Sequence, residues 1–354
     1  MTTLNSKTPA QLGFHMPAEW TPHAATWLTW PKDPETWPDR VDQVQEIYIE
    51  MLAALTPHEK VNLLVDDEST EESIRRLAVF PGASNIQFHQ VETVDSWIRD
   101  YGPNFLIGSN GQLAFNDWIF NAWGNKYEEL KRDDQIPKIL ASRLDALRFE
   151  PGIVMEGGSI EVNGAGCVLT TEQCLLNQNR NPHLDRETIE QYLSDYLGVQ
   201  KVLWLGEGIV GDDTDGHIDD IARFVSPNTI VCVVEEDPAD ANYELLQENL
   251  ERLQQMTDVN NNHFQIVSLP MPGVVGGSNT DTRNLERLPA SYANFYIANK
   301  VVLAPVFGHK NDSKAVETLQ GLFQTRRVVP INCEPLVWGM GTIHCVTQQQ
   351  PAIK

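Results

Sequence analysis

The stretch VLWLGEGIVGDDTDGHIDDIARFVSPNTIVCVVEEDPADANYELLQENLERL, from Val202 to Leu253, holds one complete unit of the pattern that organises this chain. It starts with a short β-type run and passes through an Asp-rich loop. It then turns back at Ser226-Pro-Asn228 as a hairpin and ends in a segment whose apolar residues recur at helical spacing. The order strand, loop, hairpin, helix is the unit from which we predict the fold.

This unit recurs, and its repetition predicts the architecture. It returns about every 55 to 70 residues, giving four or five copies in a chain of 354 residues. Modules of this size bury their apolar faces only against their neighbours. We therefore expect one α/β domain over residues 1–354, with the modules in a closed ring, rather than two separate domains. The hairpin turns of the copies are predicted at Ser109-Asn-Gly111, Asn163-Gly-Ala-Gly166, Ser226-Pro-Asn228 and Ala298-Asn-Lys300.

Periodicity also predicts the elements inside the copies. Helices are expected over Val41–Leu55, Ser69–Phe80, Ile136–Leu147, Ile189–Leu197, Tyr243–Leu253 and Asp312–Phe323. Ser69 with Glu72 resembles a capping box, Asp312 is an expected cap, and Gly198 is placed to end a helix. Strands are expected at Val61–Val65, Ile86–Val91, Val202–Leu205, Phe264–Val267 and Val328–Ile331. Two more strand-like stretches, His23–Trp30 and Thr342–Thr347, could pair to complete the last module.

Composition narrows the class of protein. The chain is 41% hydrophobic with a mean hydropathy of −0.32, and no apolar run approaches membrane-spanning length. A formal net charge of −23 argues against nucleic acid or an acidic membrane as partner. It permits a cationic substrate, although solubility is the more common reason for such a charge. Five cysteines without a Cys-x-x-Cys pair, and a start without signal features, lead us to expect free thiols and a cytoplasmic location.

The loops between strand and hairpin carry the unusual polar residues. Asp100 lies in Trp97-Ile-Arg-Asp-Tyr-Gly102, and Glu156 in Met155-Glu-Gly-Gly158. The Asp-rich loop from Gly211 to Asp220 holds His217 and Asp219, and the last loop, Trp338-Gly-Met-Gly-Thr-Ile-His-Cys345, ends in a thiol. The loop Met271–Thr282 shows no obvious catalytic group. Each group alone is ordinary: an Arg-Asp pair is commonly a surface ion pair, and a lone Cys is commonly buried. A ring would bring all of them to one end of its axis.

The combination of a thiol with several carboxylates indicates a cationic substrate. Carboxylates beside a cysteine raise the pKa of the thiol unless a positive group offsets them. An ester or amide hydrolase would instead need an oxyanion hole without surplus negative charge. A guanidinium matches this surplus of negative charge, because it is always protonated and presents paired N–H groups that donate to carboxylates.

At this point the chain resembles agmatine deiminase, of the peptidyl-arginine deiminase type common in bacteria and plants. The likeness covers essentially the full length. Besides the site loops it includes Met16-Pro-Ala-Glu-Trp20, Asp117-Trp-Ile-Phe-Asn-Ala-Trp-Gly124, Leu175-Leu-Asn-Gln-Asn-Arg-Asn-Pro182, Ser291-Tyr-Ala-Asn-Phe-Tyr-Ile-Ala-Asn299 and Ile343-His-Cys-Val-Thr-Gln-Gln-Gln350. The resemblance implies a five-bladed α/β propeller (pentein) of repeated ββαβ modules around a pseudo-fivefold axis. It also implies a homodimer, with agmatine, a small cationic guanidino compound, converted to N-carbamoylputrescine.

The resemblance also implies roles for single residues. Cys345 would be the nucleophile and His217 the general acid and base. Asp100 and Asp219 would grip the guanidinium, and Glu156 would orient His217. Trp97 and Trp123 resemble the aromatic residues that line the substrate channel. Neither a metal nor an organic cofactor is required.

Two departures from the family pattern lie beside the site. Arg-Asp-Tyr-Gly102 stands where the family usually has Arg-Asp-Thr-Gly, and Gly339-Met-Gly-Thr342 stands where it has Gly-Gly-Gly-Asn. These two departures bear on the part of the substrate beyond the guanidinium, so free arginine and peptidyl arginine remain alternatives to agmatine. A carboxylate tail would need a cation, and the sequence does not place Arg180, Arg283 or Lys310.

Other classes are kept as alternatives. Amidinotransfer would use the same nucleophile. A calcium-binding loop at Asp213–Asp219 would need a closing Glu, and the chain has Phe224 and Val225 at that distance. A metallohydrolase would need a second His at ligand spacing to His217.

Overall fold

The computed structural model describes residues 7–276 and 287–353. The quoted stretch forms the predicted unit. β11 (Ala222–Ser226) pairs antiparallel with β12 (Thr229–Val234), and β12 pairs in parallel with β13 (Gln265–Pro270). α8 (Tyr243–Gln255) connects the two parallel strands and buries Leu246 and Leu253. All six residues of β12 are buried, because both faces of this strand are covered.

The described residues form five small sheets, each built on a hairpin or a strand pair with a parallel neighbour. The second module contains β8 (Glu161–Val162), β9 (Cys167–Thr171), β10 (Lys201–Leu205), α6 (Glu172–Leu175) and α7 (Arg186–Leu197). The fourth contains β14 (Tyr296–Ile297), β15 (Val301–Val306), β16 (Arg327–Asn332) and α9 (Asp312–Leu322). The α/β class and the hairpins predicted around the four turns are confirmed.

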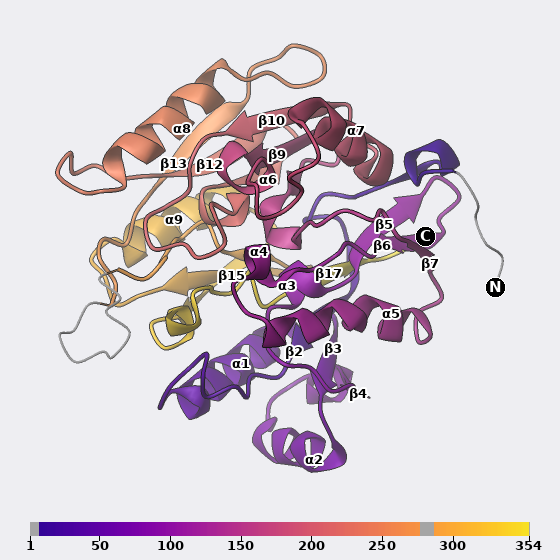
Figure 1. The fold of residues 1–354 in the computed structure, drawn as a ribbon. Coiled ribbons are helices and arrows are strands. Elements are labelled where there is room, and N and C mark those ends of the chain that lie inside the picture. Colours follow the sequence, from indigo (N-terminus) through magenta and orange to yellow (C-terminus); the bar gives the residue numbers. More distant parts are fainter. Residues whose placement is uncertain (1–6, 277–286, 354) are drawn as a thin grey trace.

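The two remaining sheets have four strands each. One contains β1 (Phe14–His15), β5 (Asn104–Gly108), β6 (Leu113–Asn116) and β7 (Leu147–Phe149), together with α5 (Ile136–Ala141). The other contains β17 (Gln348–Pro351), β2 (His23–Thr29), β3 (Lys60–Val65) and β4 (Ile86–Gln90), together with α1 (Val41–Leu55) and α2 (Glu68–Leu77). Two short helices, α3 (Ile98–Tyr101) and α4 (Ala122–Asn125), lie near the middle of Figure 1, and the longer helices lie at its periphery.

Short 3₁₀ turns complete the order of elements. They are η1 (Ala10–Leu12), η2 (Ala83–Asn85), η3 (Glu129–Gln135), η4 (Gly157–Ser159), η5 (Ile218–Asp220) and η6 (Leu336–Gly339). Strand order by itself defines no rotation axis, so the pseudo-fivefold symmetry stays a prediction. None of the helices in the described part of the chain has the length and apolar character needed to cross a bilayer.

The two ends of the chain meet in one sheet, but not through the stretch that was predicted. β17 pairs antiparallel with β2, with Gln348 opposite Trp27. The prediction that Thr342–Thr347 forms this strand is wrong, because those residues fold into turns in which the Val346 N–H donates to Thr342 O. The chain can pair with β2 only after it has turned around Cys345.

Three helix boundaries also differ from the prediction. Asp67, not Ser69, caps α2, and its carboxylate accepts from the Thr70 N–H at 2.8 Å. α5 ends at Ala141, since the chain must leave the helix before Leu147 starts β7. Asp312 is the first residue of α9 rather than its cap; its carboxylate accepts from Phe307 N and His309 N in the preceding loop. Gly198 ends α7 in the left-handed conformation, as predicted.

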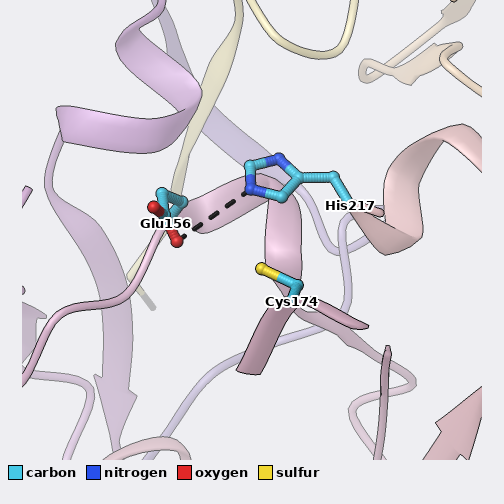
Figure 2. A group of neighbouring side chains, drawn as sticks. All are labelled: Glu156, Cys174 and His217. Carbon is cyan, nitrogen blue, oxygen red and sulfur yellow. Dashed lines mark ion pairs between the residues drawn. The ribbon is translucent and has the colours of Figure 1, made fainter. Parts of the chain in front are cut away.

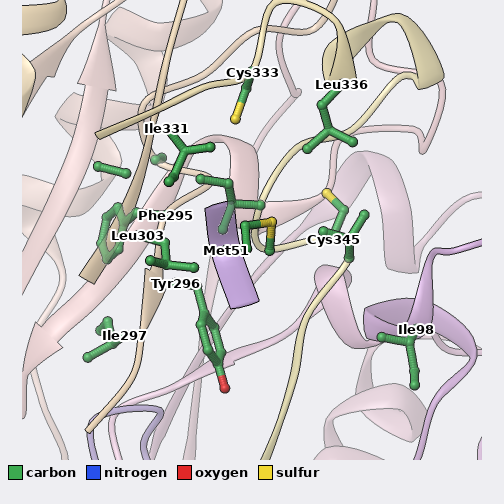
Figure 3. Close-up of a cluster of buried hydrophobic side chains, with 14 of the residues drawn as sticks. Met51, Ile98, Phe295, Tyr296, Ile297, Leu303, Ile331, Cys333, Leu336 and Cys345 are labelled. Carbon is green, nitrogen blue, oxygen red and sulfur yellow. The ribbon is translucent and has the colours of Figure 1, made fainter. Parts of the chain in front are cut away.

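A large apolar cluster joins the modules. It includes residues from all five sheets, and a smaller cluster lies between the second module and the sheet of β1, β5, β6 and β7. Cys345 belongs to the large cluster, and Figure 3 draws it together with Met51, Phe295 and Leu303. The thiol of Cys345 therefore lies at the boundary between the core and the polar groups described next.

Candidate active site

Four segments that are far apart in the sequence bring the predicted site residues together. Asp100 lies on α3, Glu156 directly precedes η4, His217 precedes η5, and Asp219 lies within η5. Cys345 follows η6, in the turns that lead to β17. All five are buried. The predicted convergence of these loops is confirmed by the distances that follow.

His217 lies between two carboxylates. Its Nδ1 is 3.8 Å from Asp100 Oδ1, and its Nε2 is 4.0 Å from Glu156 Oε2. Figure 2 shows the His217 ring and the Glu156 carboxylate pointing toward one another. Within the described residues, neither Nε2 nor Oε2 has another hydrogen-bond partner. Burial lowers the pKa of His217 to about 3, with Arg180 and Lys126 acting in the same direction. The imidazole is therefore neutral and can accept a proton.

Glycine is required at the contact between these groups. A Cβ atom on Gly158 would lie 2.6 Å from His217 Nδ1 and 2.9 Å from Asp100 Oδ1. The Gly158 N–H also donates to Asp100 Oδ1 at 2.9 Å. The Glu-Gly-Gly pattern thus supplies a carboxylate and leaves room for the imidazole at the same time.

The two aspartates have opposite electrostatic environments. Burial raises the pKa of Asp100 well above its ordinary value, and the charges of Asp219 and Glu156 raise it further. Burial would also raise the pKa of Asp219, but the hydrogen bond with His344 Nδ1 at 2.7 Å and the electrostatic attraction of neighbouring groups such as Arg223 together outweigh it, and the pKa is lowered. Asp219 Oδ1 has no hydrogen-bond partner among the described residues. Asp219 is thus an ionised carboxylate with an acceptor oxygen to spare.

Cys345 is held in its thiol form by its surroundings. Burial raises the pKa of Cys345 well above its ordinary value, and Asp219, Asp220 and Asp100 add to the shift. Its Sγ lies 3.8 Å from Asp219 Oδ2. A cation placed among these carboxylates would lower the pKa of the thiol, so the site is built to become reactive when a positive ligand enters.

Two tryptophans contact the acidic groups of the site. Trp123 Nε1 donates to Asp100 Oδ2 at 2.9 Å, and Trp97 Nε1 donates to Asp95 Oδ2 at 2.9 Å. Trp123 belongs to a turn in which four successive residues, 122–125, have positive φ angles of 54°, 52°, 87° and 65°. Such angles are unfavourable for residues other than glycine and are maintained only where the surroundings impose them. Here they deliver the indole N–H to Asp100.

Both tryptophans line a cavity of about 510 Å³ that reaches Cys345. Its lining is strongly acidic: Asp33, Glu35, Asp95, Asp100, Glu128, Glu129 and Asp213. Among the described lining residues the one cation is Lys126, whose Nζ is 3.4 Å from Asp213 Oδ1 and 2.9 Å from Asp215 Oδ1. The cavity therefore offers a path to the thiol that suits a positively charged molecule.

Several residues that complete the site were not predicted from the sequence. Arg180 Nε donates to Glu156 Oε1 at 2.7 Å, and His344 Nε2 lies 2.8 Å from Glu19 Oε2. Asn294 Nδ2 donates to Cys345 Sγ at 3.2 Å. All of them except His344 lie in motifs quoted only for their resemblance, and His344 directly precedes the thiol. No local pattern distinguishes them: Arg180 reaches Glu156 across 24 residues of the same module, and His344 and Asn294 act on partners in other modules.

Two groups of side chains have the composition of a metal site. Glu156, Cys174 and His217 (Figure 2) place ligand atoms within 4.8 Å of one another, as do Asp219, Asp220 and Cys345. Glu156 is already paired with the Arg180 guanidinium, whose charge disfavours a second cation at the same carboxylate. In the loop considered for calcium, Asp213–Asp219, the Gly216 N–H donates to Asp212 just before the loop, and Asp215 pairs with Arg180. We assign no metal to either group.

Comparison with known proteins agrees with the site. The sequence profile of the Porphyromonas-type peptidyl-arginine deiminase family matches residues 15–351. The agmatine deiminase of Pseudomonas fluorescens is 39% identical, over 99% of each chain. The solved structure of the Enterococcus faecalis agmatine deiminase is 36% identical with a TM-score of 0.91, over 99% of this chain and 100% of that one.

A third similar protein is a Cys-to-Ser variant of the C. jejuni agmatine deiminase, solved with substrate bound. It is 29% identical with a TM-score of 0.85, over 96% of this chain and 97% of that one. The likeness in sequence and in structure spans nearly the whole molecule and includes the segments that carry Asp100, Glu156, His217, Asp219 and Cys345. This chain belongs to the Porphyromonas-type peptidyl-arginine deiminase family.

Proposed function

We propose that this protein is an agmatine deiminase, a hydrolase that cleaves a C–N bond of a linear amidine. It converts agmatine and water to N-carbamoylputrescine and ammonia. The observation that carries the proposal is the buried cluster of Cys345, His217 and three carboxylates at a cavity with an acidic lining. Relatives that match over nearly the whole chain are named agmatine deiminases, which supports the same activity here.

In the proposed mechanism the guanidinium binds first. Asp219 Oδ1, which lacks a protein partner among the described residues, accepts one N–H. Asp100, held in place by Trp123 Nε1 and Gly158 N, accepts another. The positive charge of the ligand favours the ionised form of Asp100 and of the thiol. The proton of Cys345 moves to His217, which leaves a thiolate and an imidazolium.

The covalent steps follow from this arrangement. Sγ of Cys345 attacks the guanidinium carbon, and an S–C bond forms. The C–N bond to one amino group breaks as His217 gives its proton to the departing ammonia. Water then attacks the amidino-cysteine carbon while His217 takes its proton, the S–C bond breaks, and His217 returns the proton to sulfur. The ureido product releases its remaining proton to the ammonia. Glu156 faces Nε2 and stabilises the imidazolium.

The cavity favours an amine tail over a carboxylate tail. Seven acidic side chains contribute to its lining, and its cation among the described residues, Lys126, is paired with Asp213 and Asp215. A free arginine would bring its carboxylate into this negative environment, whereas the terminal ammonium of agmatine would be attracted. Arg180 is fully engaged with Glu156 and Asp215. Arg283 lies outside the described residues.

The test measures ammonia release from agmatine, free arginine and a blocked arginyl peptide side by side. We expect agmatine to be turned over with the highest kcat/KM. Cys345→Ala and Cys345→Ser should abolish turnover while agmatine still binds in calorimetry. Turnover by Cys345→Ala would overturn the mechanism, and a higher kcat/KM for the arginyl peptide would overturn the proposal that agmatine is the substrate. Added amines separate hydrolysis from amidinotransfer, since transfer forms a new guanidino compound without ammonia.

The remaining expectations belong to the same proposal. The single domain over residues 1–354 is supported by the β17–β2 pairing and by the shared apolar cluster. The homodimer and the cytoplasmic location rest on the resemblance and on composition, and sedimentation and fractionation would test them.

A further inference from the structure

Asn294 makes a set of contacts that connects it to the sulfur of Cys345. It is fully buried in the segment before β14. Its Nδ2 lies 3.2 Å from Cys345 Sγ and 3.0 Å from Asp220 Oδ1. Its Oδ1 accepts from the Thr342 hydroxyl at 2.7 Å and from the His344 N–H at 2.9 Å. Every polar atom of this amide therefore has a partner within the site.

These partners determine which way the amide faces. The backbone N–H of His344 can only donate, so the atom opposite it must be the oxygen of Asn294. If the amide were rotated by half a turn, its NH₂ group would oppose that N–H, and its oxygen would face the Asp220 carboxylate. Both changes are unfavourable. The NH₂ group consequently points at the sulfur and at Asp220.

The sulfur needs such a donor because its surroundings oppose a negative charge. Asp100 on α3, together with Asp219 and Asp220 on η5, faces it with carboxylates, and burial acts in the same direction. His217 and His344 flank the same groups, and Tyr48 on α1 lies close enough for its phenol to interact with the thiol. The backbone of Thr342 favours the anion, and Asn294 supplies a side-chain N–H.

We propose that Asn294 stabilises the thiolate that forms when Cys345 loses its proton, by donating an N–H···S hydrogen bond, with Asp220 fixing the second proton of the amide. When Cys345 ionises, the sulfur keeps its electron pair and its proton leaves for His217; Asn294 transfers no proton. The importance of this step for turnover rests on the proposed function of Cys345. The effect on the thiol itself does not depend on the identity of the substrate.

The test is the rate at which iodoacetamide alkylates Cys345 as a function of pH, followed by mass spectrometry of the peptide that contains it. Cys345 lines the cavity and can be reached by a small reagent. Asn294→Ala should raise the apparent pKa of the thiol by about one unit, which is a tenfold loss of thiolate at a given pH. Asn294→Asp keeps the acceptor oxygen and replaces the donor, so it should raise that pKa further.

Two more variants make the result interpretable. Thr342→Val removes the hydroxyl that anchors Asn294 Oδ1 without touching the sulfur, so it should raise the pKa by less than Asn294→Ala does. It also decides the question if Asn294→Ala fails to fold. Asn249→Ala is the matched control. Asn249, on α8, is equally buried; it accepts from the Gly206 N–H and donates to Glu207 O. Its loss should therefore lower the melting temperature and leave the pKa of the Cys345 thiol unchanged.

The outcomes separate this inference from the proposed function. A thiol pKa that stays within a few tenths of a unit in the folded Asn294 variants, or in Thr342→Val if those do not fold, would overturn the role of Asn294 even if agmatine is turned over. A raised thiol pKa in a protein that releases no ammonia from agmatine would leave the role of Asn294 standing and reject the substrate. A matching shift in the acidic limb of the kcat/KM profile for agmatine would support both.

Discussion

Replacing Arg180 by methionine should destabilise the protein more than any surface charge substitution. The Arg180 and Glu156 side chains are both fully buried, and their atoms are 2.7 Å apart. Arg180 also donates to Asp215 Oδ2 at 2.6 Å and to Thr214 O at 2.8 Å, in the loop that leads to His217. The Arg180→Met variant would leave Glu156 charged, buried and without its cation.

The magnitude follows from that geometry. Removing one partner of a buried ion pair costs about 3–5 kcal/mol, because the other charge stays desolvated. A typical domain is stable by only about 5–15 kcal/mol. The exposed pair Arg75–Glu71 on α2 is the control, with 56% and 21% of its side chains exposed. Arg75→Met should cost less than about 1 kcal/mol.

The assay is urea unfolding of the wild type, Arg180→Met, Glu156→Gln and the double variant. In the double variant neither member of this pair leaves a buried charge behind, so much of the lost unfolding free energy should return, and the interaction energy of the cycle should exceed about 2 kcal/mol. Burial raises the pKa of Glu156, and Arg180 opposes this. Without Arg180 the folded-state pKa rises further above the unfolded value, so the deficit should be largest at high pH and shrink as the pH falls. A deficit under 1 kcal/mol that does not vary with pH would refute this account of the pair.

Two further predictions concern His217 and Gly158. The pKa of His217 is lowered to about 3, so the unfolded chain binds one more proton than the folded protein between that value and about 6.5, and stability falls as the pH falls through this window. Relative to His217→Asn, the wild type should therefore lose roughly 1 kcal/mol of unfolding free energy per pH unit between pH 6 and pH 5. Parallel curves of unfolding free energy against pH for the two proteins would contradict the lowered pKa of His217. Gly158→Ala should lower kcat/KM at least about 100-fold, because its Cβ would collide with His217 and Asp100. Gly321→Ala on α9, where no atom lies within 4 Å of the added Cβ, should be fully active, and equal activity of the two variants would show that the close contact at Gly158 is not needed.

Much of the fold could be predicted because its signals are local. Turn residues such as Asn163-Gly-Ala-Gly166 and the helical spacing from Tyr243 to Leu253 act over a few positions, and the structure places a hairpin and a helix there. The errors arose where a distant contact overrides local preference. Thr342–Thr347 has a strand-like composition, yet it turns because Asn294 binds Thr342 and His344 across about 50 residues of chain.

The sequence by itself determined the repeated unit, the loops that bear chemistry and the five groups that meet in the site: Asp100, Glu156, His217, Asp219 and Cys345. Only the tertiary structure decided how these groups are supported. His344 between Asp219 and Glu19 and Asn294 on the sulfur join different modules, and Arg180 reaches Glu156 between two loops of one module. The physical reason is that a hydrogen bond between modules depends on how their sheets pack, and periodicity within one module carries no information about that packing.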